Sequence, residues 1–181
     1  MKISVIIPTY NRSKLVKKTV ESLLRQNFPA DKFEIIVCDD GSTDDTEKAI
    51  ADLAETNKLP KIIYLTQKNQ GPASARNLGI EKASGEIIAF TDSDCEATEN
   101  WLSEIAQSFR ENHEIVGVGG VTYSTPEKIT PFTHQIENKE PWSFPTCNIA
   151  YSKKVLDEVG GFDKKFPFTN EDADISWRIE R

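Results

Sequence analysis

The sequence predicts an α/β fold in which a mostly parallel sheet is flanked by helices on both faces. Short runs rich in Ile, Val and Phe alternate with amphipathic stretches of helical spacing through residues 1–123, and this alternation indicates repeated βα units. The crossover connections of such units place helices on both faces of the sheet. Ligands then bind beyond the carboxyl ends of the strands, so a site is expected in the loops that follow the strands.

Five strands are expected from short β-rich runs, and their ranges are 3–7, 33–38, 62–65, 87–90 and 115–118. Apolar residues three and four positions apart predict a helix after each of the first four runs. The first helix is expected after the loop 8–13, and the second from a cap within residues 42–45. Pro72 suits the first turn of the third helix, and Thr98 is expected to cap the fourth.

The periodic pattern stops after Tyr123. Prolines punctuate residues 124–147, which we interpret as a surface excursion or lid because no secondary-structure period is visible there. Order is expected to return at residues 147–151. Ser152 is then expected to cap a short helix that ends at Gly160.

Composition and charge favour a single folded domain and exclude several classes of protein. The chain has 181 residues, of which 38% are hydrophobic, and this is enough for one domain with its own core. A net charge of −7 argues against nucleic acid as a partner, since no basic stripe can neutralise phosphates. No apolar run approaches the roughly 20 residues that span a bilayer, and the N-terminus enters a strand-like run rather than a signal peptide. The chain is therefore expected in the cytoplasm, with its cysteines reduced.

Two of the expected strands end in paired acids. Asp92 and Asp94 follow the fourth run, and residues two apart in an extended backbone point to the same side. Convergent carboxylates suit a hard divalent cation, Mg²⁺ or Mn²⁺, which takes phosphate oxygens as further ligands. Alone, this pattern is more often turn or capping chemistry, but Asp39 and Asp40 end the second run in the same way. We therefore expect a nucleoside diphosphate site formed by loops 8–13, 39–45 and 92–96.

Five motifs follow one another along nearly the whole chain. They are Ser4-Val-Ile-Ile-Pro-Thr-Tyr-Asn-Arg12, Glu34-Ile-Ile-Val-Cys-Asp-Asp-Gly-Ser-Thr-Asp44, Ala75-Arg-Asn-Leu-Gly79, Asp92-Ser-Asp94, and Gly160-Gly-Phe-Asp163 with Glu171-Asp172. In this order they resemble the motifs of family 2 glycosyltransferases. The resemblance implies a GT-A (Rossmann-like) fold and a single glycosyltransferase domain over residues 1–181. Its nucleotide-sugar-binding half would be 1–123 and its acceptor-side half 124–181.

The resemblance also implies roles for single residues on the donor side. The nucleotide would be bound by Pro8, Thr9, Tyr10, Arg12, Asp40, Arg76, Asp92 and Ser93. Within this set, Asp40 would accept a hydrogen bond from the imide N–H of uracil. Arg76 would either add positive charge near the phosphates or pair with the neighbouring acids. Asp94, together with Asp92, would hold Mg²⁺ or Mn²⁺.

On the acceptor side, the resemblance assigns the catalytic role to the acidic pair Glu171-Asp172. Asp172 is the expected base, because it begins a helix-like run whose N-terminus favours the carboxylate over the acid. Glu171, one residue away on the helix, would bind or orient the acceptor instead. Asp174 is expected to face solvent.

The implied activity is inverting transfer of a sugar from a nucleotide-diphosphate sugar, with a UDP-linked donor favoured. The acceptor would be a hydroxyl group of a saccharide or of a lipid-linked intermediate in polysaccharide biosynthesis, and a lipid-linked acceptor would bring the chain to the inner face of the membrane. Two alternatives stay open, a non-catalytic nucleotide-sugar-binding module and a sugar-nucleotide pyrophosphorylase. The latter should carry a glycine-rich basic loop after the first strand, where this chain has Pro8-Thr-Tyr-Asn-Arg12. Family members usually continue further, so residues 1–181 are expected to be a catalytic-core fragment.

Overall fold

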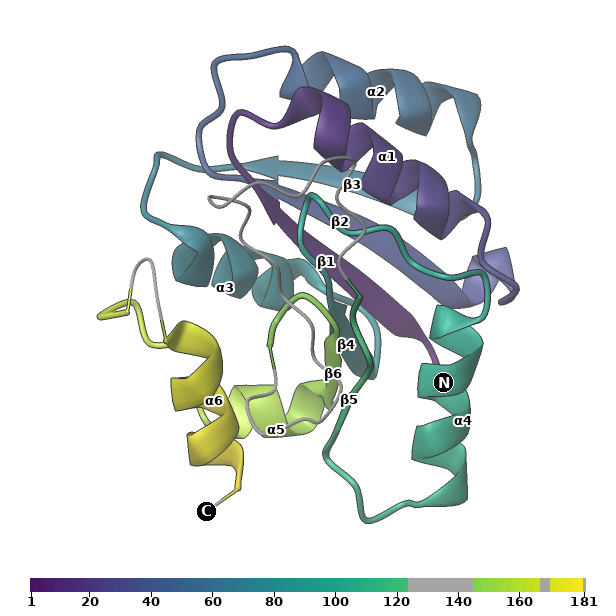
Figure 1. Ribbon diagram of the computed structural model, residues 1–181, viewed down its shortest axis with the longest axis vertical. Helices are drawn as coiled ribbons and strands as arrows, with labels where there is room; N and C mark the ends of the chain where they lie inside the picture. The colour runs from purple at the N-terminus through teal and green to yellow at the C-terminus, as the bar shows by residue number, and fades with distance from the viewer. Residues whose placement is uncertain (124–144, 167–169, 181) are drawn as a thin grey trace.

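A computed structural model describes residues 1–123, 145–166 and 170–180, and a six-stranded sheet with the order β3-β2-β1-β4-β6-β5 lies at its centre (Figure 1). The strands are β1 (Ile3–Thr9), β2 (Phe33–Asp39), β3 (Lys61–Thr66), β4 (Ile87–Phe90), β5 (Gly117–Gly119) and β6 (Ile149–Ser152). The first four strands pair in parallel, whereas β6 pairs antiparallel with both β4 and β5. The predicted mostly parallel sheet is confirmed. The chain moves outward from β1 to β3 and then returns to place β4 on the other side of β1, so the order of strands reverses at β1 and β4.

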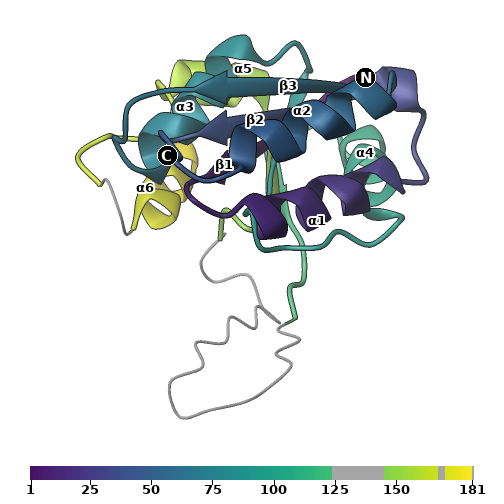
Figure 2. The ribbon, with the colours of Figure 1, turned by 90° about the horizontal axis from the view of Figure 1, so that it is seen from above.

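Helices cover both faces of the sheet (Figure 2). One face packs against α1 (Ser13–Leu24), α2 (Thr46–Thr56) and α4 (Trp101–Glu111); the other packs against α3 (Pro72–Lys82), α5 (Lys153–Glu158) and α6 (Glu171–Ile179). A short 3-10 turn, η1 (Ala30–Lys32), precedes β2. In β1, Val5 and Ile7 belong to the first face and Ile6 to the second. The strand therefore needs apolar residues at consecutive positions, which is why it reads as a continuous hydrophobic run.

Helix α3 lies especially close to the centre of the sheet. A Cβ at Gly79 would come 2.7 Å from Cγ2 of Ile6 and 2.9 Å from Sγ of Cys38. Only a glycine lets the helix approach β1 and β2 this closely. The N-terminal half of α3, which carries Arg76 and Asn77, is thereby held beside the carboxyl ends of the strands.

Several predicted element ends are confirmed and others are wrong. Ser152 caps α5 as expected, since its Oγ accepts a hydrogen bond from the Val155 N–H at 3.3 Å, and Gly160 follows the helix with a φ of +75°. Thr98 does not cap α4, which begins at Trp101 after Asn100. The carbonyl of Thr98, rather than its hydroxyl, accepts a bond from the Trp101 N–H. The fifth strand begins two residues later and ends one residue later than expected, because residues 117–119 are the ones that pair with β6.

The predicted excursion at 124–147 falls largely outside the described residues. Both segments that flank it are nevertheless fixed to the sheet, because the Gly120 N–H donates to the carbonyl of Asn148 at 3.0 Å, and Asn148 Nδ2 donates to the carbonyl of Val121 at 3.0 Å. Within the described ranges, none of the helices combines the length and the apolar character needed to cross a membrane.

Candidate active site

The loops that follow β1 and β2 are joined to each other at the carboxyl edge of the sheet. The register of the two strands places Thr9 beside Asp39, so their loops begin together. The Asn11 N–H donates to Oγ of Ser42 at 2.7 Å, and the Thr43 N–H donates to Oδ1 of Asn11 at 2.7 Å. Asn11 adopts a φ of +51°, a left-handed conformation that asparagine tolerates. The expected meeting of these two loops is confirmed.

Asp39 holds its own loop together. Its Oδ1 accepts the Ser42 N–H at 2.7 Å and its Oδ2 accepts the Tyr64 hydroxyl at 2.6 Å, and the side chain is fully buried. Burial raises the pKa of Tyr64, and the Asp39 carboxylate raises it further. Gly41 takes a φ of +86° within the same turn, a conformation that favours glycine. The role of Asp39 is thus structural, since it fixes the loop that follows β2.

Asp40 faces the loop between β3 and α3. Its Oδ1 accepts from Nε2 of Gln67 at 2.7 Å and from the Gln70 N–H at 2.8 Å, and its Oδ2 accepts from the Gly71 N–H at 2.8 Å. Only 5% of the residue is exposed. A carboxylate oxygen can accept two hydrogen bonds, so Oδ2 keeps the capacity for one more donor. Gln67 and the amides of 70 and 71 were not singled out from the sequence, because no motif links them to Asp40.

The two acids of the D-x-D sequence lie in a turn just beyond β4. The Cys95 N–H donates to the carbonyl of Asp92 at 3.2 Å, which closes this turn. The extended backbone expected at Asp92 and Asp94 is therefore wrong, and the two carboxylates meet different arginines. Asp94 pairs with Arg12 at 2.7 Å, with both side chains about half exposed, and Asp92 pairs with Arg76 at 3.0 Å. Burial raises the pKa of Asp92, while Arg76 opposes that increase and the Asp94 charge adds to it.

Arg76 connects the D-x-D turn to α6. Its Nη2 contacts Oδ1 of Asp92 at 3.0 Å, and its Nη1 contacts Oε1 of Glu171 at 2.8 Å. The arginine is 3% exposed, and its Nε has no hydrogen-bond partner among the described residues. Of the two roles considered for Arg76, the pairing with neighbouring acids is observed. One guanidinium thus joins acids from segments 79 residues apart, 92 and 171.

The acids at the start of α6 differ in their surroundings. Glu171 is buried against Arg76, whereas Asp172 is partly exposed and its Oδ1 accepts the Ala173 N–H at 2.8 Å. Asp174 does not simply face solvent as expected, because Nε and Nη2 of Arg178 contact its Oδ2 at 2.9 and 2.7 Å. Asp172 is therefore the acid of this group whose carboxylate is accessible and carries no ion pair within the described part of the chain.

The other residues expected to contact the nucleotide surround the end of β1 and the turn after β4. Pro8 and Thr9 are buried, Ser93 is 3% exposed, and Tyr10 is 47% exposed. The Thr9 hydroxyl is buried with no hydrogen-bond partner in the segments that the structure describes. These residues thus lie at the same edge as Asp92 and Asp94, with Tyr10 the most accessible of them.

The residues at this edge fit a cation that is only partly coordinated by protein. No cluster of three or more His, Cys, Asp or Glu side chains suited to a metal ion occurs within residues 1–123, 145–166 and 170–180. From the described part of the chain, the carboxylates of Asp92 and Asp94 would be the ligands. This matches Mg²⁺ or Mn²⁺, which keeps water or takes phosphate oxygens at its remaining positions.

The fold places acidic loops at the carboxyl edge of a mostly parallel sheet, and Arg76 links an acidic helix to them. The chain belongs to the glycosyl transferase family 2, whose family model matches residues 4–163. Similarity to solved glycosyltransferase structures shows that this domain has the GT-A fold.

Glycosyltransferase AglE of Haloferax volcanii is 33% identical over 97% of this chain and 59% of its own length. The crystal structure of S. aureus TarS 1-349 in complex with UDP-GlcNAc superposes with a TM-score of 0.81 at 26% identity, over 99% of this chain and 53% of that chain. The mannosyltransferase PcManGT from Pyrobaculum calidifontis, in complex with GDP-Man and Mn²⁺, has a TM-score of 0.82 at 23% identity, over 98% and 51%, and shows the same fold. This chain thus spans between half and three fifths of these proteins.

Proposed function

We propose that this chain transfers a sugar from a nucleotide-diphosphate sugar to an acceptor hydroxyl with inversion at the anomeric carbon, in a reaction that depends on Mg²⁺ or Mn²⁺. The observation that carries the proposal is the pair of contacts made by Arg76, at 3.0 Å to Asp92 and 2.8 Å to Glu171. They hold the start of α6 beside the D-x-D turn. A donor at that turn would then lie next to the accessible carboxylate of Asp172.

In the proposed reaction, Asp172 receives the proton of the acceptor hydroxyl. The acceptor oxygen forms a bond to the anomeric carbon while the bond from that carbon to the diphosphate oxygen breaks, and the electron pair leaves with the diphosphate. A direct displacement of this kind needs a base within roughly 2.6–3.2 Å of the attacking hydroxyl. It needs no nucleophile from the chain, and Asp172 suits the base because Glu171 and Asp174 are held by arginines.

On the donor side, Asp92 and Asp94 would hold the cation, whose chemistry is to neutralise the charge that develops on the leaving diphosphate. Arg12 is half exposed beside Asp94 and would turn from that carboxylate toward the phosphates when the cation takes its place. Pro8, Thr9 and Tyr10 would line the base pocket, and Asp40 would accept the imide N–H of uracil through Oδ2.

A UDP-linked donor is favoured because the TarS structure similar to this chain at 26% identity is a complex with UDP-GlcNAc. The acceptor would be a saccharide or lipid-linked hydroxyl. In the second case, the chain would work from the cytoplasm at the inner face of the membrane.

Calorimetric titration with UDP, GDP, CDP and dTDP, each with Mn²⁺ and again with EDTA, tests the proposal. We expect UDP to bind with Mn²⁺ and to bind far more weakly in EDTA. Asp94→Asn should abolish the difference, because one anionic ligand is lost, whereas the control Asp52→Asn on the exposed side of α2 should keep it. Binding of equal strength with and without the metal would contradict the metal role, and binding without release of UDP from any UDP-sugar would favour a non-catalytic module.

A further inference from the structure

The side-chain amide of Asn77 holds the turn that precedes α6. Its Nδ2 donates to the carbonyl of Phe162 at 2.8 Å, and the Phe162 N–H donates to its Oδ1 at 2.8 Å. The amide therefore satisfies both backbone groups of a residue 85 positions away. Contact with the turn is close, since a Cβ at Gly161 would lie 2.5 Å from Oδ1 of Asn77.

The ring of Phe162 supports Arg76. It is 2% exposed and meets Phe90 of β4 edge to face, with 5.3 Å between ring centroids. The guanidinium carbon of Arg76 lies 5.6 Å from the centroid of the same ring. Phe162 thus packs against the arginine that contacts both Asp92 and Glu171, and the position of its backbone is set by Asn77.

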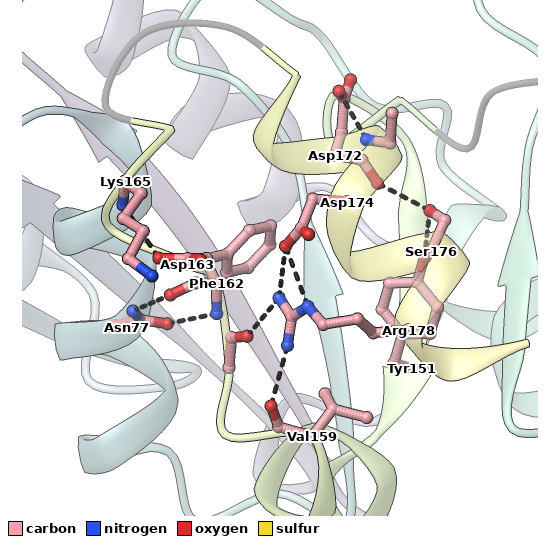
Figure 3. A network of polar contacts seen from close by, with 12 residues as sticks. Asn77, Tyr151, Val159, Phe162, Asp163, Lys165, Asp172, Asp174, Ser176 and Arg178 are labelled. Atoms are coloured by element: carbon pink, nitrogen blue, oxygen red, sulfur yellow. Dashed lines mark hydrogen bonds and ion pairs between the residues drawn. The ribbon is translucent and has the colours of Figure 1, made fainter. Parts of the chain in front are cut away.

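The same turn also receives the far end of α6, as the close view in Figure 3 shows. Nη1 of Arg178 donates to the carbonyl of Val159 at 2.8 Å and Nη2 donates to the carbonyl of Gly161 at 2.8 Å, while Asp174 holds the guanidinium in place. Helix α6 is therefore tied to the turn near its C-terminus by Arg178 and near its N-terminus through Glu171, Arg76 and Phe162.

We propose that Asn77 is a positioning residue for the acceptor-side acids, because it fixes the turn 160–162 on which both attachments of α6 depend. This inference rests on the proposed function and adds to it. Asn77 contacts neither the donor nor the acceptor in this scheme. It sets the distance between Asp172 and the D-x-D turn, and a misplacement of about 1 Å at an active site can lower a rate by on the order of 10²-fold.

The test compares Asn77→Ala and Asn77→Asp with the wild type and with Asn148→Ala. The aspartate variant keeps the volume and the acceptor Oδ1 but faces the Phe162 carbonyl with an oxygen, so it removes the donor without opening a cavity. Asn148 is a matched control, because it is another half-buried amide with two side-chain hydrogen bonds, to Trp101 and Val121, away from this turn.

Two measurements are made on each variant in the full-length protein. The first is hydrogen–deuterium exchange of residues 171–179, which we expect to become faster in both Asn77 variants and to stay unchanged in Asn148→Ala. The second is release of UDP from UDP-GlcNAc with Mn²⁺, which we expect to fall by on the order of 10–10²-fold in the Asn77 variants, with UDP affinity kept within about twofold.

A double variant separates positioning from general stability. If Asn77 acts through Asp172, Asn77→Ala added to Asp172→Asn should lower the rate little further, because residues that act as a unit are not additive. Unchanged exchange in α6, or a rate loss no greater than that of Asn148→Ala, overturns the role of Asn77. If the wild type instead binds no nucleotide diphosphate and releases none, the proposed function fails, whatever the exchange shows.

Discussion

Among the acids in the first turn of α6, Asp172 differs from its neighbours in the contacts that hold it. Glu171 and Asp174 are each paired with an arginine, while the Asp172 carboxylate accepts only the N–H of Ala173 within the described residues. Backbone amides at the start of a helix favour a negative charge there. Within the described residues, Asp172 is therefore the partly exposed acid at the start of α6 that no arginine holds.

We expect Asp172→Asn to lower kcat by on the order of 10²–10⁴, the usual contribution of a positioned base. UDP affinity with Mn²⁺ should survive, because the residue lies outside the nucleotide loops. Steady-state kinetics and calorimetry on one preparation measure both. Glu180→Gln changes a carboxylate at the other end of the same helix and should leave both quantities unchanged. Near-normal turnover in Asp172→Asn would transfer the role to Glu171.

Asp40 combines a local structural role with its proposed contact to the base. Asp40→Ala should weaken UDP binding by about 1–3 kcal/mol, because a buried donor of the base loses a charged acceptor. The loop 67–71 also loses its acceptor, so thermal stability should fall. Gln67→Ala removes one of the donors to Asp40 but leaves the carboxylate, and should keep UDP affinity within about twofold. Equal losses of affinity in the two variants would mean that the loop, and not the carboxylate, recognises the base.

The sequence identified single residues best where a motif places them at the end of a strand. Asp39, Asp40, Asp92 and Asp94 are found at the carboxyl edge as predicted, because a parallel sheet brings these ends together. It assigned no role to Asn77 within its motif, because the partner of Asn77 is the backbone of Phe162, which leaves no trace in residue type. Pairs such as Arg178 with Asp174 were missed because several acids stand at helical spacing from one another, and packing selects among them.

At the scale of elements, α3 sets the geometry of the site. It meets β1 and β2 at Gly79, and from adjacent positions its Arg76 contacts Glu171 and its Asn77 contacts the Phe162 backbone. In an exposed helix, Gly→Ala raises stability by up to about 1 kcal/mol. At this crossing the added methyl would overlap the Ile6 and Cys38 side chains, so packing opposes propensity.

We therefore expect Gly79→Ala to destabilise the protein by about 1–3 kcal/mol, the usual range for overpacking a core. Urea denaturation followed by far-UV circular dichroism gives the free energy of unfolding. The sign of the change in the free energy of unfolding decides between the two possibilities. A more stable variant would show that α3 can move away from the sheet at little cost, and that the contact does not fix Arg76.

Elements were predicted well where burial alone defines them and less well at their ends. The run 87–90 matches β4 to the residue, because a buried strand needs continuous apolar residues. The choice of Thr98 as a cap placed the start of α4 wrongly, because contacts with distant residues fix the chain before this helix. Ser22 of α1 accepts a hydrogen bond from the Ala97 N–H. Gln26, which follows α1, donates to the carbonyl of Thr98 and accepts from the Leu102 N–H. Contacts of this kind join distant segments and have no local signature.

At the scale of the whole molecule, Glu34 joins several segments at the edge of the sheet opposite the site. Its carboxylate accepts from the Ser4 hydroxyl at 2.7 Å, from the N–H and hydroxyl of Ser84 at 2.8 Å each, and from Lys2 at 3.3 Å. Burial raises the pKa of Glu34, but the hydrogen bonds and the Lys2 charge outweigh it and hold the pKa below its ordinary value of 4.5.

A carboxyl group whose pKa is lower in the folded protein than in the unfolded chain stabilises the fold at a pH above its unfolded pKa. This stabilisation is lost as the pH falls through the pKa of the folded protein. We expect Glu34→Gln to be less stable than the wild type at neutral pH, with the difference shrinking once the pH falls below the ordinary value of 4.5. Urea denaturation across this range measures it. Glu86→Gln, an exposed acid at the same edge, should show almost no such change. A difference for Glu34→Gln that stays constant with pH would assign its effect to packing.

The antiparallel direction of β6 affects how the connection that precedes it can vary in length. Since β6 runs against its neighbours, Val121 and Asn148 are joined at the carboxyl edge, and the chain leaves the sheet and re-enters it at almost one point. A connection with its ends clamped side by side can change length at small entropic cost, about 0.6 kcal/mol for each doubling. Insertions or exchanges between 123 and 145 can then be accommodated while the strands of the sheet keep their register.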